Sequence, residues 1–211
     1  IPWGECGAEY IIDATGAFKG YKMDDVNAPS LNASQSTINT TYGTASSSNT
    51  VTLTKKTFAA GDTTTISAEA ESVTGLTATV SGSTATIATT AATPAGTYTV
   101  TFKAGSASTT VKVVVAKAQV SATATATGTI TAGTRVGDLN ITVSQAPSNA
   151  GYTLDTHIVK VLINGIEETA NYRLQSRDVV TVKVTATADK NHTFANGATT
   201  ATATATVGTV Q

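Results

Sequence analysis

Charged residues are scarce in this chain. Only 13% of its 211 residues are Asp, Glu, Lys or Arg, and the formal net charge at pH 7 is -1. Nucleic-acid binding depends on clustered Lys and Arg side chains that release counterions from phosphates, and the basic residues here are scattered. We therefore expect no nucleic-acid partner.

Cysteine and long apolar runs are also scarce. The one cysteine, Cys6, cannot form a disulfide within the chain. No apolar run approaches the roughly 18 residues of a membrane span, so no membrane span is expected. The chain starts at Ile1 without an initiator Met or a signal-peptide pattern, and we expect it to be a processed or trimmed form.

Aromatic residues are few in this chain, and small hydroxyl-bearing residues are abundant. The chain has 45 Thr and 16 Ser but only 11 aromatic residues, and its apolar residues are mostly Ala and Val. Such a composition favours strands and thin cores between stacked sheets. A cleft enzyme of this size would normally carry more aromatic and ionisable groups. The composition predicts an all-β structural protein that is not an enzyme.

The block from about residue 50 to Lys117 alternates apolar and polar residues. The period of two appears in several runs, and turn-forming residues such as Gly61, Asp62 and Gly82 fall between them. Seven or so short strands at about ten-residue spacing predict a β-sandwich.

This block resembles a bacterial immunoglobulin-like domain of the kind found in surface proteins. The resemblance rests on the phrase from Thr50 to Phe58, the turn from Ala60 to Thr63, and Ala95 to Val100 before a Val-rich strand. It implies an immunoglobulin-like fold, which serves spacers, adhesins and capsid decorations alike.

The second block, residues 118–211, repeats the alternation with different details. Asn164 and Gly165 form the two-residue signature of a type I′ hairpin. Residues Ile166 to Arg177 fit either a loop or one short helix, because Ile166, Ala170 and Leu174 are four apart. The sequence thus predicts two immunoglobulin-like β-sandwich domains in tandem, at 36–117 and 118–211, preceded by an extended strand and linker at 1–35.

The N-terminal segment has two distinct faces if it is extended. The even-numbered residues from 6 to 18 form an almost wholly apolar face, and we predict that this segment is an inter-subunit strand. The residues of that face are Cys6, Ala8, Tyr10, Ile12, Ala14, Gly16 and Phe18. Such a strand could complete a sheet of its own chain or fill the open edge of a neighbour by β-augmentation. Head-to-tail exchange between copies would build an open filament.

The same segment has a short resemblance to glyceraldehyde-3-phosphate dehydrogenase. It is carried by Trp3, Gly4, Gly7, Ala8, Tyr10, Thr15, Gly16 and Phe18. That family needs a glycine-rich dinucleotide fingerprint and a nucleophilic Cys in a Ser-Cys-Thr-Thr-Asn motif, and neither is in this chain. The resemblance therefore implies no activity.

No residue pattern indicates catalysis, a cofactor or a metal site. His157 and His192 have no Cys or second His at ligand spacing, so both are predicted to be surface or rim residues, and His192→Ala is expected to leave any assembly intact. The number of Asn-x-Ser/Thr triplets is close to chance. Lys55, Lys112 and Asn196 are candidate members of a Lys–Asn isopeptide crosslink, which would require a buried Lys, Asn and acid together.

These observations predict an extracellular or cell-surface structural subunit. The leading hypothesis is a filament or pilus-like fibre in which copies of the chain polymerise through the N-terminal strand. The alternative is an adhesin, S-layer or phage virion decoration module that binds a surface carbohydrate or protein. Since the single Trp, Trp3, lies in the N-terminal segment rather than in a loop, the composition favours assembly over sugar binding.

Overall fold

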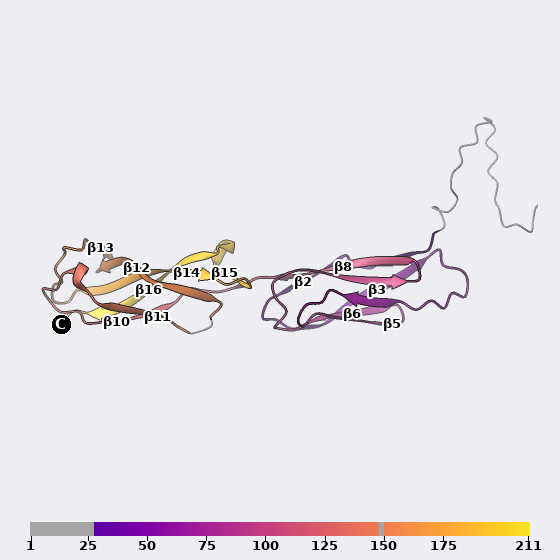
Figure 1. The fold of residues 1–211 in the computed structure, drawn as a ribbon, viewed down its shortest axis with the longest axis horizontal. Helices are drawn as coiled ribbons and strands as arrows, with labels where there is room; N and C mark the ends of the chain where they lie inside the picture. Colours follow the sequence, from indigo (N-terminus) through magenta and orange to yellow (C-terminus); the bar gives the residue numbers. More distant parts are fainter. Residues whose placement is uncertain (1–27, 148–149) are drawn as a thin grey trace, which may run out of the picture.

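The computed structural model describes residues 28–147 and 150–211. These residues form two β-sandwiches that lie end to end along the long axis of the molecule (Figure 1). The only helical segments in the described residues are short 3-10 turns, such as that at Val136–Asp138. The predicted all-β class is confirmed.

The first sandwich consists of two four-stranded sheets. Its strands are β1 (Ser30–Ala33), β2 (Thr37–Thr41), β3 (Ser46–Lys56), β4 (Ser67–Ala70), β5 (Thr77–Ser81), β6 (Thr84–Thr89), β7 (Gly96–Ala104) and β8 (Ala107–Ala116). The strand orders are β1-β3-β6-β5 and β2-β8-β7-β4. All neighbours are antiparallel except β2 and β8, which are parallel.

This strand order is that of an immunoglobulin-like domain. The sheet β1-β3-β6-β5 corresponds to strands A, B, E and D of that fold. In the other sheet, β4, β7 and β8 correspond to strands C, F and G. Tyr98, near the start of β7, donates a hydrogen bond from its hydroxyl to the carbonyl oxygen of Pro94, at 2.9 Å. A tyrosine that bonds back to the chain just before strand F is a recurrent feature of this fold. The strand order and the Tyr98 hydrogen bond therefore both indicate an immunoglobulin-like domain.

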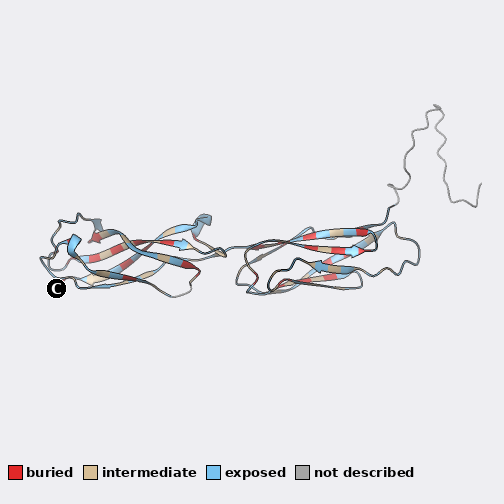
Figure 2. Ribbon diagram, in the orientation of Figure 1, coloured by how far each residue is buried: buried red, intermediate tan, exposed pale blue. Residues whose placement is uncertain are grey.

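The core of the first sandwich follows from the period of two. Buried and exposed residues alternate along its strands (Figure 2). Val51, Leu53, Val100 and Phe102 are 0–2% exposed and point between the two sheets. Since most other core side chains are Val and Ala, Phe102 supplies the largest buried side chain.

The second sandwich is less regular. Its strands are β9 (Ala118–Gln119), β10 (Ala124–Gly128), β11 (Ile141–Gln145), β12 (Tyr152–Ile163), β13 (Ile166–Glu167), β14 (Val179–Ala188), β15 (His192–Thr193) and β16 (Thr200–Thr209). A four-stranded sheet of order β13-β12-β14-β16 is covered by a two-stranded sheet of β10 and β11. The chain is thus two tandem immunoglobulin-like domains of unequal completeness.

Two predicted features of the second sandwich can be compared directly. The hairpin at Asn164 and Gly165 is confirmed, because φ is 51° and 85° at these residues and they join β12 to β13. The alternative of a helix from Ile166 to Arg177 is wrong. After Glu167 the chain forms turns rather than a helix. β13 and an isolated antiparallel β-bridge between Arg173 and Arg135 hold this segment against the sheets.

The start of the first sandwich also differs from the sequence interpretation. The stretch from Asn27 to Asn49 is rich in Ser, Thr and Asn, a composition that predicts a linker with one short strand, but it contains β1, β2 and the beginning of β3. Leu31 and Ile38 are 3% and 5% exposed, so single apolar residues anchor each short strand to the core. The proposed domain start at residue 36 falls between β1 and β2.

Candidate interaction sites

The predicted inter-subunit strand, from Cys6 to Phe18, lies outside the described residues. Its point of attachment is described. Ser30 pairs with Lys56 at the end of β3, and the hydroxyl of Thr57 donates to the carbonyl oxygen of Ala28. The chain therefore enters the first sandwich at the pole that faces away from the second sandwich (Figure 1).

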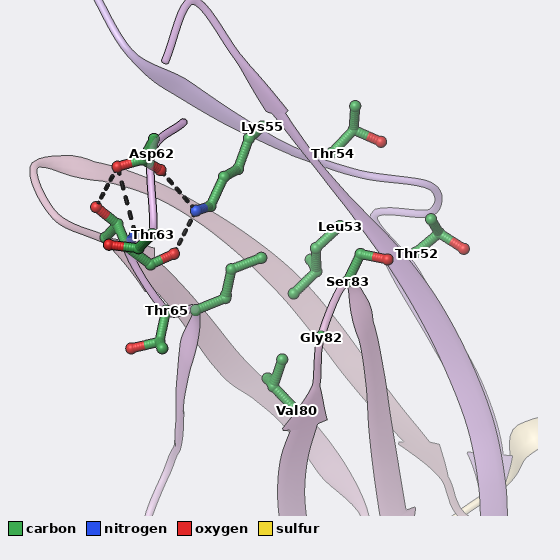
Figure 3. Close-up of a pocket in the computed structure, with 12 residues that line it drawn as sticks. Thr52, Leu53, Thr54, Lys55, Asp62, Thr63, Thr65, Val80, Gly82 and Ser83 are labelled. Atoms are coloured by element: carbon green, nitrogen blue, oxygen red, sulfur yellow. Dashed lines mark hydrogen bonds and ion pairs between the residues drawn. The ribbon is translucent and has the colours of Figure 1, made fainter. Parts of the chain in front are cut away.

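A cavity of about 650 Å³ lies near this outer pole. It is lined by Thr52, Leu53, Thr54, Lys55, Asp62, Thr63, Thr64, Thr65, Ile66, Val80, Gly82 and Ser83. Figure 3 shows Leu53, Val80 and the Lys55–Asp62 pair around it. Leu53, Ile66 and Val80 supply apolar surface, and the rest of the lining is mainly threonine hydroxyls and backbone.

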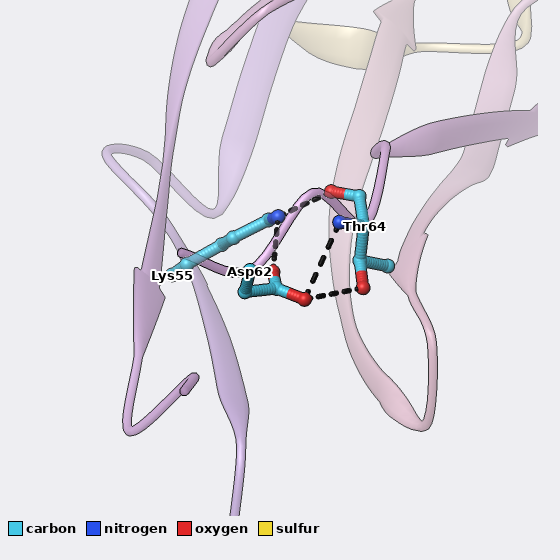
Figure 4. Close-up of polar contacts among 3 residues, drawn as sticks. All are labelled: Lys55, Asp62 and Thr64. Carbon is cyan, nitrogen blue, oxygen red and sulfur yellow. Dashed lines mark hydrogen bonds and ion pairs between the residues drawn. The ribbon is translucent and has the colours of Figure 1, made fainter. Parts of the chain in front are cut away.

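An ion pair between Lys55 and Asp62 forms part of the cavity lining, and Figure 4 shows its polar contacts. The Nζ of Lys55 lies 2.8 Å from Oδ2 of Asp62 and also donates to the carbonyl oxygen of Thr64. The Thr64 hydroxyl donates to Oδ1 of Asp62, at 2.6 Å. Hydrogen bonds from Lys55 and then Thr64 hold the pKa of Asp62 below its ordinary value. Because both ions are satisfied by each other and by the loop, the pair fixes the wall of the cavity.

The junction between the two sandwiches is held by direct contacts. The backbone N–H of Ala95 in the first sandwich donates to Oδ1 of Asn191 in the second, at 3.0 Å. The rings of Tyr42 and His192 meet edge to face with centroids 5.1 Å apart. These contacts restrict bending between the sandwiches.

His192 is therefore more than a surface residue. Its side chain is 16% exposed, and its Nδ1 lies 2.7 Å from Oδ1 of Asp189. Burial raises the pKa of Asp189, but hydrogen bonds from His192 and the Asn191 N–H outweigh it, so the pKa is lowered. His157, by contrast, is exposed on β12, as predicted. No local sequence pattern indicates this role of His192, because its partner Tyr42 is 150 residues away.

We expect His192→Ala to loosen the junction without unfolding either sandwich. The substitution removes the ring contact with Tyr42 and the hydrogen bond to Asp189, but it leaves both cores intact. Small-angle X-ray scattering should show a shorter maximum dimension and a broader distribution of distances. His157→Ala is the matched control. An unchanged scattering profile for His192→Ala would show that the backbone contacts alone fix the junction.

The remaining candidate residues are not brought together. Lys55 and Lys112 lie in different sheets of the first sandwich, whereas Asn196 lies in a 3-10 turn of the second, so no isopeptide triad is assembled. In the two described ranges, no group of three or more His, Cys, Asp or Glu side chains is placed to hold a metal ion. No helix within the described part is long and apolar enough to cross a membrane.

Comparisons with known proteins bear on this fold only weakly. No protein-family model matches the chain, and no curated protein matches it in sequence. Among solved structures, it is similar to the titin domains Z1Z2 in complex with telethonin, with 16% identity, 86% of this chain and 96% of that chain covered, and a TM-score of 0.36. The Yersinia pseudotuberculosis adhesin InvE matches with 15% identity, coverages of 85% and 58%, and a TM-score of 0.34.

The protocadherin γB4 extracellular domain is a third similar structure. It has 11% identity and a TM-score of 0.37, and the match covers 86% of this chain but 34% of that chain. TM-scores this low do not identify a family. The assignment as tandem immunoglobulin-like domains rests on strand order and the Tyr98 contact.

Proposed function

We propose that this chain is a structural subunit of an extracellular assembly, a short rod that copies of itself extend into a filament. The observation that carries the proposal is the end-to-end arrangement of two sandwiches (Figure 1), whose junction includes a hydrogen bond from Ala95 to Asn191. A rod of this kind transmits position and tension along its axis, which is what a fibre or spacer needs.

The proposed link between subunits is the strand from Cys6 to Phe18. It precedes the first sandwich and attaches at one end of the rod, at Ser30. A strand that leaves from one end and pairs with the next subunit makes a heterologous contact, and repetition of that contact gives an open filament. Main-chain hydrogen bonds would supply affinity, and alternate side chains would supply specificity.

The surface chemistry is consistent with an extracellular role. Most outward-facing strand positions are Thr, Ser or Lys, so the sheets present a polar surface to solvent. The resemblance of residues 50–117 to bacterial immunoglobulin-like surface domains supports the same location.

Electron microscopy of the purified full-length chain tests the proposal. We expect filaments that form at micromolar to millimolar protein concentration and whose axial repeat matches the length of one two-domain rod. Size-exclusion chromatography with light scattering should show mass increasing with concentration. A protein that stays monomeric across that range would contradict the proposed function.

A binding module is the second candidate, and the cavity at the outer pole is the observation that favours it. Its hydroxyl-rich lining around an apolar floor would suit a short peptide or a sugar. Chemical-shift perturbation of Leu53 and Val80 on addition of candidate ligands would distinguish this role. If the chain is a binding module, it should bind the ligand saturably with a fixed stoichiometry and should not form fibres.

A further inference from the structure

Two of the asparagines in the chain are followed directly by a glycine. These are Asn164, before Gly165, and Asn196, before Gly197. A glycine after asparagine leaves its own backbone nitrogen open to reaction, because it has no side chain to shield that atom. Apart from the adjacent residues, a methyl group at either glycine would meet no atom within 4 Å. Both pairs are therefore sterically open to attack of the glycine nitrogen on the asparagine side chain.

The reaction that such a pair undergoes is deamidation. The glycine nitrogen forms a bond to Cγ of the asparagine, the bond from Cγ to the amide nitrogen breaks, and ammonia leaves with the proton of the glycine N–H. The resulting five-membered succinimide is opened by water at either carbonyl, which gives aspartate or isoaspartate. Water is the one co-reactant, and no atom is oxidised or reduced. Because the attacking nitrogen must lose its proton, the reaction becomes faster as the pH rises.

Exposure and backbone conformation do not distinguish the two asparagines. Both residues are exposed, and φ is 51° at Asn164 and 58° at Asn196. Asparagine tolerates this left-handed conformation better than most residues do. Any difference in reactivity between the two sites must therefore come from the contacts of their side chains.

The side chain of Asn164 is held at both of its polar atoms. Its Nδ2 donates to Oδ1 of Asp178 at 2.8 Å, and its Oδ1 accepts from the backbone N–H of Val179 at 2.9 Å. The backbone N–H of Asn164 also donates to the carbonyl oxygen of Val179, at 2.9 Å. For Cγ to reach the nitrogen of Gly165, the carboxamide must turn away and lose both of its side-chain hydrogen bonds.

The charge of Asp178 opposes the reaction as well. Attack by the deprotonated nitrogen carries negative charge to the carboxamide of Asn164. The carboxylate of Asp178 lies 2.8 Å from that carboxamide, and Asp178 is only 5% exposed, so solvent screens the repulsion poorly. Asp178 therefore disfavours deamidation of Asn164 both by a hydrogen bond and by its charge.

Asn196 has no comparable restraint. It lies in the 3-10 turn Ala195–Gly197, and residues 195–200 are all exposed. Within residues 28–147 and 150–211, its side chain forms no hydrogen bond with another part of the protein. The Gly197 N–H donates to the carbonyl oxygen of Phe194, but the distance is 3.2 Å, at the long end for such a bond. Opening of this surface turn is therefore enough to bring the reacting atoms together.

We propose that Asn196 is the site at which the folded protein deamidates, and that Asp178 protects Asn164 from the same reaction. The turn at Asn196 lies outside the proposed contact between subunits, so its chemistry does not depend on filament formation. Each event replaces a neutral amide by a carboxylate and changes the formal net charge of the chain from -1 to -2.

The modification alters the connection between β15 and β16. This turn is closed by a hydrogen bond from the Phe194 N–H to the carbonyl oxygen of Ala198, at 2.8 Å. Isoaspartate adds one carbon to the backbone between these two groups, so the bond should weaken. β16 remains paired with β14 from Thr200 to Thr209, and the second sandwich should stay folded. The expected product is a folded, more acidic chain with an altered surface turn.

Incubation of the full-length chain at mildly alkaline pH tests the proposal. Peptide mapping by mass spectrometry identifies each converted asparagine, and chromatography separates the aspartate and isoaspartate products. Since one hydrogen bond changes a population by roughly two- to tenfold, the two bonds of Asn164 predict conversion at least about ten times slower there than at Asn196. In guanidinium chloride, which removes the structure, the two rates should become similar. Equal rates in the folded chain, or no conversion at Asn196, would overturn the proposal.

A pair of substitutions separates the effect of Asp178 from a general loss of stability. Asp178→Ala removes the acceptor and the charge beside Asn164, and conversion of Asn164 should become several times faster. Val184→Ala destabilises the same sandwich through a side chain that is 0% exposed, without touching Asn164, and is the matched control. Both variants are measured at a temperature at which NMR shows the second sandwich folded. Equal acceleration of Asn164 in both would show that opening of the whole sandwich, and not the loss of Asp178, controls its reaction.

Isoelectric focusing of Asn196→Gln gives a second measurement. Glutamine keeps the carboxamide, but its longer side chain would have to close a six-membered ring, which forms much more slowly. The more acidic form that accumulates in the unaltered chain should therefore almost disappear. If it accumulates at the same rate in Asn196→Gln, another residue is the reactive site and the proposal is wrong.

Discussion

Ile12→Asp is expected to abolish assembly, whereas Ile11→Asp, one residue away, should leave it nearly unchanged. In an extended strand these two side chains point to opposite faces. Burial of Tyr10, Ile12 and Phe18 would each contribute about 1.5–3 kcal/mol to docking. A carboxylate at position 12 would instead be forced into an apolar contact, which costs several kcal/mol unless it is protonated.

Light scattering of the two full-length variants at matched concentration measures this contrast. The variants have the same charge and the same composition, so a general loss of adhesion would affect both equally. A synthetic peptide of residues 5–19 should cap growing filaments of the unaltered chain, and the same peptide with Ile12→Asp should not. Equal behaviour of Ile11→Asp and Ile12→Asp would rule out a strand with two distinct faces.

The sequence predicts the fold well where apolar residues alternate over long runs. β3, β7, β8, β14 and β16 are 9 to 11 residues long, and each is visible as a period of two. The Asn164-Gly165 hairpin is equally local, because both residues tolerate positive φ. Strand order within the first sandwich then follows from the general rules of this fold.

Short strands that are held by contacts with distant parts of the chain cannot be predicted from this alternation. β1 and β2 contain four and five residues, with one buried apolar side chain in each. What fixes them is pairing with β3 and β8, which lie 20 to 75 residues further along the chain. Sequence alternation alone therefore made this region look like a linker.

The candidate sites depend even more on tertiary structure. The cavity combines the end of β3, the loop before β4 and the β5–β6 turn. The junction joins Tyr42 to His192 and Ala95 to Asn191. None of these is encoded by residue spacing, whereas the predicted strand from Cys6 to Phe18 rests on a purely local alternation in the sequence.

A buried carboxylate, Asp178, organises the outer end of the second sandwich. It is 5% exposed and accepts hydrogen bonds from the Asn164 side chain at 2.8 Å, the Tyr172 hydroxyl at 3.0 Å and the Gln175 N–H at 2.8 Å. The hydrogen bond from the Gln175 backbone does most to hold the pKa of Asp178 below its ordinary value. Burial raises this pKa, and the hydrogen bonds from Asn164 and Tyr172 lower it further. One side chain thus ties together the hairpin, the irregular segment and the start of β14.

Asp178→Ala should lower the midpoint of thermal unfolding of the second sandwich by roughly 5–15 °C, because three donors lose their buried acceptor. Asp62→Ala, which removes a partly exposed ion pair at the protein surface, is the matched control and should have a much smaller effect. Calorimetry with residue-resolved NMR separates the two sandwiches. Equal shifts for both variants would contradict this role.

The pH dependence gives an independent check of the same contact. Because the pKa of Asp178 is lower in the folded state than in the unfolded chain, its contribution to stability is complete well above the unfolded value of about 3.9. That contribution should be lost as the pH falls through this value toward the folded pKa. Asp178→Asn keeps the size of the side chain and removes the titrating group, so the unfolding midpoint of the second sandwich should fall less steeply between about pH 5 and pH 2 than in the unaltered chain. Parallel pH profiles for the two proteins would show that another acid governs the loss of stability.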